Sequence, residues 1–148
     1  MKIIIGCDHG GYDLKLEIIA RLEKEGHTVV DVGCPDRNPV DYPDVAADLC
    51  HRLLDEKEDF GILICGTGIG ISIAANKIDG IRAAHLSDAY SASMAKAHNN
   101  ANVITLGART LGVELAWTIV KAYMDSSFLG GVHQTRVEKI AALEKEDK

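Results

Sequence analysis

The segment Cys65-Gly66-Thr67-Gly68-Ile69-Gly70 combines a thiol with a glycine-rich turn. Its glycines allow positive φ angles and a close approach to the backbone. A helix is expected to begin near Ile69, so free amide groups and the positive end of the helix dipole face the turn. This arrangement favours a bound anion and the thiolate form of Cys65, which is the reactive form. The hydroxyls of Thr67 and Ser72 are expected to hydrogen-bond a substrate there.

Simpler interpretations of this segment stay open. The glycines can serve only to bring a helix close to a sheet, and Cys65 can be an inert buried thiol. A dinucleotide-binding turn is disfavoured, because the spacing is Gly-x-Gly-x-Gly and Ile71 stands where that fingerprint needs glycine. The turn also follows the third expected strand and not the first.

Three other polar clusters are expected beside this turn. Asp8-His9 follows the first expected strand, Asp41-Tyr42-Pro43 lies beyond the second, and His98-Asn99 stands just before the fifth. Ligands of open parallel sheets bind outside the carboxyl ends of the strands, so all four clusters are predicted to meet in one site. Asp8-His9 can instead merely close a loop, and His98 can be a helix-end residue that complements the dipole.

Two arginines and three possible metal ligands could also belong to this site. Arg109 and Arg136 are either surface charges or, beside an anion-binding turn, ligands of a phosphate group. A metal site formed by Cys65, His9 and His98 is disfavoured, because no metal-ligand spacing supports it. We therefore expect no metal ion in this protein.

Short apolar runs alternate with amphipathic segments along the chain. The runs that predict strands are residues 3–7, 28–32, 60–65, 81–85 and 103–106. Helices are predicted from residue 12 to near Gly26 and over residues 43–57, 69–77, 88–99, 112–125 and 134–145, with Asp88 as a cap. Strands separated by helices imply βαβ units, so we predict a five-stranded, three-layer α/β sandwich with a parallel sheet.

Length and composition indicate one globular domain spanning residues 1–148. The helical tail from about residue 130 to 148 has only a narrow apolar stripe, so we expect it to pack on a partner subunit. Apolar residues make up 47% and charged residues 26%, and the net charge is −6. A negative chain lacks the basic footprint of nucleic-acid binding. No apolar run approaches about 18 residues, so no membrane span is expected. Four cysteines without a Cys-x-x-Cys pair and no secretion signal predict reduced thiols in a cytoplasm.

The chain resembles the type B ribose-5-phosphate isomerases and their galactose-6-phosphate and allose-6-phosphate relatives. The resemblance runs from residue 1 to about residue 143, and its most specific stretch is residues 65–77. The other matching segments are Gly6-Cys7-Asp8-His9-Gly10-Gly11, Asp41-Tyr42-Pro43, Gly80-Ile81-Arg82-Ala83, His98-Asn99, Asn102-Val103 and Gly131-Val132-His133-Gln134-Thr135-Arg136. Many members have Arg where this chain has Val132, and that Arg contacts phosphate.

The resemblance implies a Rossmann-like α/β/α sandwich and a homodimer or dimer of dimers, with sites at the subunit interface. It also implies interconversion of an aldose phosphate and a ketose phosphate without metal or cofactor. Ribose 5-phosphate and ribulose 5-phosphate are the first expected pair. Another sugar phosphate, or a non-catalytic subunit that binds sugar phosphate, stays open. The chemistry needs a base beside a carbonyl and a stabiliser for the oxyanion that forms.

The resemblance also implies a role for each site residue. Cys65 would move a proton between C1 and C2, and the backbone of residues 66–70 would stabilise the enediolate. His98 would help to open the sugar ring, with Asp8 and Tyr42 assisting, and Asn99 would hold a sugar oxygen. The remaining implied residues are Thr67 for catalysis, His9, Arg109 and Arg136 for the phosphate, and His133 as a further substrate contact. Some of these residues would come from the neighbouring subunit.

Overall fold

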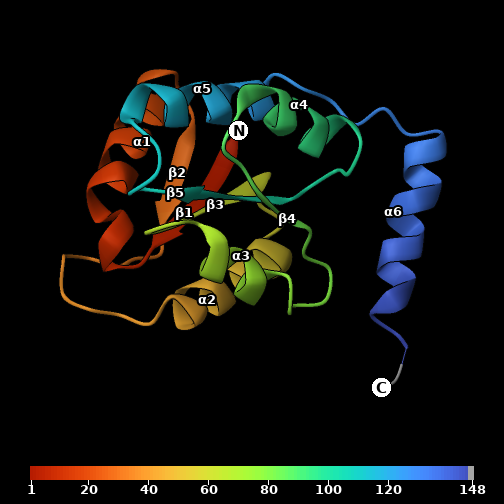
Figure 1. Ribbon diagram of the computed structural model, residues 1–148, viewed down its shortest axis with the longest axis horizontal. Helices are drawn as coiled ribbons and strands as arrows, with labels where there is room; N and C mark the ends of the chain where they lie inside the picture. The colour runs from red at the N-terminus through yellow and green to blue at the C-terminus, as the bar shows by residue number, and fades with distance from the viewer. Residues whose placement is uncertain (147–148) are drawn as a thin grey trace.

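The computed structural model describes residues 1–146 and contains one parallel sheet with helices on both faces (Figure 1). Its strands are β1 (Lys2–Cys7), β2 (Thr28–Asp31), β3 (Phe60–Cys65), β4 (Ala83–His85) and β5 (Val103–Gly107). Its helices are the short 3-10 helix η1 (His9–Gly11), α1 (Tyr12–Lys24), α2 (Tyr42–Glu56), α3 (Ile69–Ala75), α4 (Ala89–Ala97), α5 (Val113–Met124) and α6 (Val132–Leu143). Each predicted strand and helix is present, with small shifts at the ends. Asp88 caps α4 as predicted, because its Oδ1 accepts a hydrogen bond from the Ser91 amide at 2.7 Å.

The strand order is β2-β1-β3-β5-β4, and every neighbouring pair is parallel. From β1 the chain crosses to β2 on one side, whereas β3 leads to β4 and β5 on the other. The boundary between β1 and β3 is therefore the switch point of the sheet, where α/β proteins bind ligands. Cys7 pairs with Ile64 across this boundary, so Asp8 and Cys65 are neighbours at its carboxyl edge.

Two apolar cores lie against the two faces of the sheet (Figure 1). Ile3 and Ile5 of β1 face the core that contains α1, α4 and α5. Ile4 and Cys65 face the core that contains α2 and α3. The central strands are apolar on both sides because helices cover both faces. The predicted three-layer α/β sandwich is confirmed.

Lys15 is a buried cation within the core beneath α1. Its ammonium group donates to Asp31 Oδ1 at 2.9 Å and to the carbonyl oxygen of Cys34 at 2.6 Å. Removing a partner from a buried charge is costly. These contacts therefore join α1 firmly to the carboxyl end of β2.

The last helix, α6, stands apart from the rest of the molecule (Figure 1). The Leu129 amide donates to the carbonyl of Ala97 at 3.0 Å, and Glu144 Oε1 accepts from the Gly80 amide at 2.8 Å. A groove with a volume of about 830 Å³ lies between α6 and the sheet, and Ile140 and Leu143 line it. No helix within residues 1–146 combines the length and the apolar character that a membrane span requires.

Candidate active site

Cys65 ends β3 with its thiol under the glycine-rich turn. The Gly68 amide donates a hydrogen bond to Cys65 Sγ at 3.1 Å. Gly68 has a φ of +78°, which glycine adopts readily and other residues rarely do. A backbone N–H directed at sulfur stabilises negative charge on it. The predicted pairing of the thiol with the turn is therefore present.

The other thiols differ in their surroundings. Cys7 and Cys50 are completely buried, and burial raises the pKa of each thiol to about 12. These two side chains remain neutral at physiological pH. Cys65 is instead 5% exposed and receives a hydrogen bond from the Gly68 amide of the turn.

The loop after β1 lies directly beside Cys65. The Asp8 amide donates to the Ile64 carbonyl at 3.1 Å, and Asp8 Oδ1 accepts from the Gly10 amide at 2.9 Å. A Cβ atom at Gly11 would lie 2.7 Å from the carbonyl oxygen of Ile64, so only glycine allows η1 to pack this closely on β3. This packing holds the exposed ring of His9 at the same edge, where its Nδ1 accepts from the Val40 amide at 3.3 Å.

A guanidinium group and an aromatic ring flank the turn. The Arg109 amide donates to the Gly66 carbonyl at 2.9 Å, and a Cβ atom at Gly66 would lie 3.4 Å from Arg109 Nη1. A Cβ atom at Gly70 would lie 2.6 Å from Tyr42 Cζ, so the ring fills the space that a larger residue would need. The structure thus brings together the group that we call the cysteine cluster, which comprises Asp8, His9, Tyr42, residues 65–70 and Arg109.

The two hydroxyls of the turn differ in exposure. Thr67 is exposed, and its Oγ1 accepts a hydrogen bond from the Ile69 amide at 3.2 Å. Ser72 is buried, and its hydroxyl donates to the Ile69 carbonyl at 2.7 Å. Thr67 is therefore accessible to a substrate, whereas the hydroxyl proton of Ser72 is used inside α3.

Two residues that sequence reasoning did not assign to the site support the turn from below. Thr105 donates from its hydroxyl to the Gly68 carbonyl at 2.9 Å, and His85 Nδ1 lies 3.3 Å from Thr105 Oγ1. A Cβ atom at Gly68 would lie 2.7 Å from His85 Nδ1. Thr105 is the one polar side chain in the sequence of β5, and this was the available signal.

His98 and Asn99 do not join the cysteine cluster of their own chain. The prediction that they lie at the carboxyl ends of its strands was wrong. They follow α4 and precede β5, so they lie at the amino edge of the sheet. Close by, the Gly61 amide near the start of β3 donates to the carbonyl of Asn102 at 2.9 Å. Cys65 lies at the opposite end of β3. The carboxyl-edge rule applies to residues that follow a strand, and His98 stands before one.

His98 has a different partner at this edge. Its ring stacks on His133 of α6, with centroids 4.0 Å apart and planes at 9°. The pKa of His133 is lowered from its ordinary value, chiefly by burial and further by the nearby charges of His98 and Arg136. We call His98, Asn99, His133 and Arg136 the histidine cluster. The predicted site residues therefore form two groups on opposite edges of the sheet.

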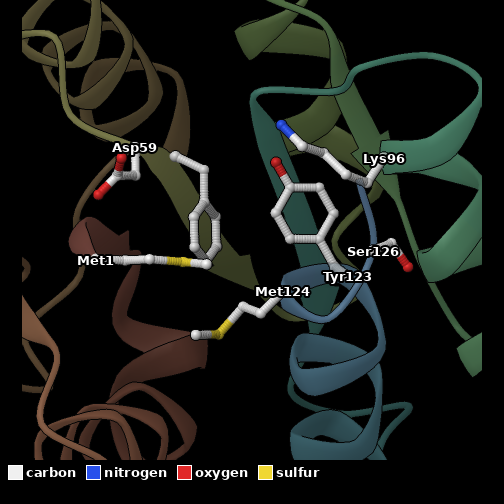
Figure 2. A pocket seen from close by; sticks show the side chains of 7 residues that line it. Met1, Asp59, Lys96, Tyr123, Met124 and Ser126 are labelled. Carbon is white, nitrogen blue, oxygen red and sulfur yellow. The ribbon is translucent and has the colours of Figure 1, made fainter. Parts of the chain in front are cut away.

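A small cavity of about 140 Å³ also lies at the amino edge, between Met1 and the end of α5 (Figure 2). Lys96 and Tyr123 line it, with Lys96 Nζ 5.9 Å from the centroid of the Tyr123 ring. None of the predicted site residues lines this cavity. Among residues 1–146, no group of three His, Cys, Asp or Glu side chains could hold a metal ion.

Comparison with known proteins identifies the family. The model of the Ribose/Galactose Isomerase family matches residues 3–140. The chain belongs to this family. It is 48% identical to the ribose-5-phosphate isomerase B of Escherichia coli, over 97% of each chain. It is also 48% identical to the D-erythrulose-4-phosphate isomerase of Pectobacterium atrosepticum, over 100% of this chain and 98% of that one.

Solved structures of the family have the same fold. Ribose-5-phosphate isomerase B of Clostridium thermocellum superposes with a TM-score of 0.98 at 49% identity, with full coverage of both chains. A structure from Mycoplasma genitalium, described as having bound ribulose-5-phosphate, superposes with a TM-score of 0.92 at 39% identity. It covers 98% of this chain and 97% of that one. The Rossmann-like architecture expected of the family is therefore present over the whole described chain.

The stacked histidines predict a loss of stability on acidification. The pKa of His133 lies below 6.5 in the folded state, so the unfolded chain binds a proton first as the pH falls through 6.5. The free energy of unfolding, measured with urea, should therefore decrease from pH 7.5 to pH 5.5. His133→Gln should lose part of this decrease, whereas replacement of the exposed His51 of α2 by Gln should retain it. Equal pH dependence in all three proteins would contradict the assignment.

Proposed function

We propose that residues 1–148 act as one isomerase domain that interconverts an aldose phosphate and a ketose phosphate. The hydrogen bond from Gly68 to Cys65 Sγ is the observation that carries this proposal, because it joins a base to an anion-stabilising turn. The names of relatives that match along nearly the whole chain support the reaction class. The four free thiols agree with the reducing, cytoplasmic compartment that we expect.

In the proposed reaction, the Cys65 thiolate removes the C2 proton of the open-chain aldose. The electron pair left on carbon forms the C1–C2 double bond, and the negative charge moves to the C1 oxygen. Backbone amides of residues 66–70 stabilise this oxyanion. The Cys65 thiol then returns the proton to C1, while a hydroxyl proton passes from the C2 oxygen to the C1 oxygen. The exposed hydroxyl of Thr67, two residues after Cys65 in the chain, would assist that transfer.

We further propose that two copies of the chain complete each site. The cysteine and histidine clusters lie on opposite edges of one sheet, so a single sugar cannot contact both in one chain. A twofold dimer brings the histidine cluster of one copy to the cysteine cluster of the other, and does so twice. Exposed apolar residues of α6 and the groove beside it suit a second copy, since Val132, Ile140 and Leu143 are 57%, 43% and 61% exposed.

In this dimer, the histidine cluster would open the sugar ring over the cysteine cluster of its partner. His98 would exchange protons with the ring oxygen, assisted by Asp8 and Tyr42 across the interface. Asn99 would bind a sugar hydroxyl. The phosphate would be held by residues from both clusters, namely His9, Arg109, His133 and Arg136.

The length of the sugar is the open part of the proposal. Val132 begins α6 beside His133 with an exposed apolar side chain. The family resemblance implies an Arg at this position in many members. The two relatives with equal identity are named for sugars of five and four carbons. Ribose 5-phosphate remains the substrate that we propose first. By the family resemblance, this phosphate site lacks one arginine contact that many members have.

Replacing the proposed base tests the reaction. Cys65→Ala should lower kcat on the order of 10²–10⁴-fold with an unchanged melting temperature, because no other side chain replaces the thiolate. Cys50→Ala, which alters a buried thiol of α2, should retain activity. Iodoacetamide should inactivate the wild type, and saturating sugar phosphate should protect it. Near-normal turnover by Cys65→Ala with every sugar phosphate would exclude Cys65 as the base.

Mixed dimers test the sharing of sites. Cys65→Ala and His98→Asn chains with different affinity tags are coexpressed, and the heterodimer is purified through both tags. It should have about half of the wild-type activity, because one of its two sites is intact. Each parent homodimer serves as the inactive control. A heterodimer no more active than its parents would show that both clusters act within one chain.

A substrate panel with Val132→Arg tests the phosphate site. Wild type and variant are assayed with four-, five- and six-carbon sugar phosphates. The added guanidinium should lower KM for ribose 5-phosphate by about tenfold or more, since hydrogen bonds to charged groups contribute about 1.5–3 kcal/mol. Val132→Leu provides the uncharged control. An unchanged KM in Val132→Arg would mean that position 132 does not face the phosphate.

A further inference from the structure

A polar clamp holds the turn that carries His98 and Asn99. Arg82 lies just before β4, and its Nε donates to the carbonyl oxygens of Asn99 and Asn100, each at 3.1 Å. Its Nη2 donates to the Asn100 carbonyl at 2.7 Å. The planar guanidinium therefore bridges the carbonyl groups of Asn99 and Asn100, the two residues that follow His98 directly.

Asn102 fixes the base of this clamp. Its Oδ1 accepts from the Arg82 amide at 2.8 Å, and its Nδ2 donates to the Gly80 carbonyl at 2.9 Å. The Asn102 amide in turn donates to the Arg82 carbonyl at 3.1 Å. The segments Gly80-Ile81-Arg82-Ala83 and Asn102-Val103, which the proposed reaction does not use, thus meet in one hydrogen-bonded unit.

The clamped turn has a backbone that needs such support. Asn100 has a φ of +44°, a left-handed conformation that persists where surrounding contacts determine it. Lys96 Nζ donates to Asn100 Oδ1 at 3.0 Å, and the Asn100 amide donates to the Lys96 carbonyl at 3.1 Å. Burial and the nearby charge of Arg82 lower the pKa of Lys96. Two cations thus hold a single residue, Asn100, two positions after His98.

We infer that Arg82, held by Asn102, is a positioning residue that orients His98 and Asn99 for opening of the sugar ring. The inference rests on the proposed function. The guanidinium can bridge two carbonyls at once because its donors lie in one plane, whereas a lysine ammonium acts as a point charge. Loss of the bridge frees the Asn99 and Asn100 peptides, and with them the stacking of His98 on His133.

Ring opening can be measured separately from proton transfer. Ribose 5-phosphate is largely a closed ring and must be opened before it reacts. Ribulose 5-phosphate is open, because the phosphate occupies the oxygen that would close a ring on its carbonyl. At saturating ribulose 5-phosphate, exchange of its C1 proton with deuterium from solvent needs the base and the anion-stabilising turn but no ring opening. The ratio of ribose 5-phosphate turnover to this exchange therefore reports on ring opening.

Arg82→Lys is expected to lower kcat/KM for ribose 5-phosphate on the order of 10–100-fold, since small misplacements of catalytic groups cost this much. Deuterium exchange into saturating ribulose 5-phosphate, followed by proton NMR, should change by less than about threefold, because proton transfer at Cys65 does not involve the clamped turn. Arg52→Lys is the matched control, because Arg52 pairs with Glu56 on α2. His98→Asn should show the same selective loss. The ring resonances of His98 and His133 should shift in Arg82→Lys and remain in place in Arg52→Lys.

The outcomes distinguish a failure of the positioning role of Arg82 from a failure of the proposed function. Equal losses of turnover and exchange in Arg82→Lys, or no loss beyond that of Arg52→Lys, would overturn the positioning role. Asn102→Ala removes the support of Arg82 and should reproduce the selective loss in weaker form, which keeps the test valid where Arg82→Lys is unstable. Retention of exchange by Cys65→Ala would instead refute the proposed function, and with it this inference.

Discussion

One hydrogen bond, from the Gly68 amide to Cys65 Sγ, unites the features of the cysteine cluster. The geometry of this bond depends on how Gly68 is held. The Gly68 carbonyl accepts a hydrogen bond from the Thr105 hydroxyl, and the Gly68 amide faces the sulfur. His85 occupies the space where a Cβ atom would lie. Only glycine can therefore stand at this position. The sheet beneath supplies the rest, since β3 and β5 present Cys65 and Thr105 to the same peptide turn.

Much of the cysteine cluster, and of the sheet that positions it, is predictable from local sequence. Apolar runs that end in glycine or aspartate define the strands, and the glycines after Cys65 indicate both the turn and its affinity for an anion. These signals are local, because they depend on backbone conformation within a few residues. The parallel sheet then follows from the alternation of strands and helices. The family resemblance adds the chemistry, and the residues alone left an inert thiol open.

The remaining features depend on contacts between distant residues. Lys15 looks like an ordinary exposed residue of α1, and only Asp31 and the Cys34 carbonyl explain its burial. The position of His98 was predicted wrongly because a rule for strand ends was applied to a residue before a strand. Its stacking partner His133 lies 35 positions further along the chain, on a helix that stands apart from the sheet. Such pairings leave no periodic trace in a single sequence.

The separation of the two clusters has a consequence for how such a protein behaves at low abundance. In the proposed dimer, each site takes its base from one chain and its acid–base histidine from the other, so a lone chain would hold no complete site. Specific activity would then follow the monomer–dimer equilibrium and decline on dilution. A newly synthesised chain would be inactive until it bound another copy, so dimerisation itself would produce the active enzyme.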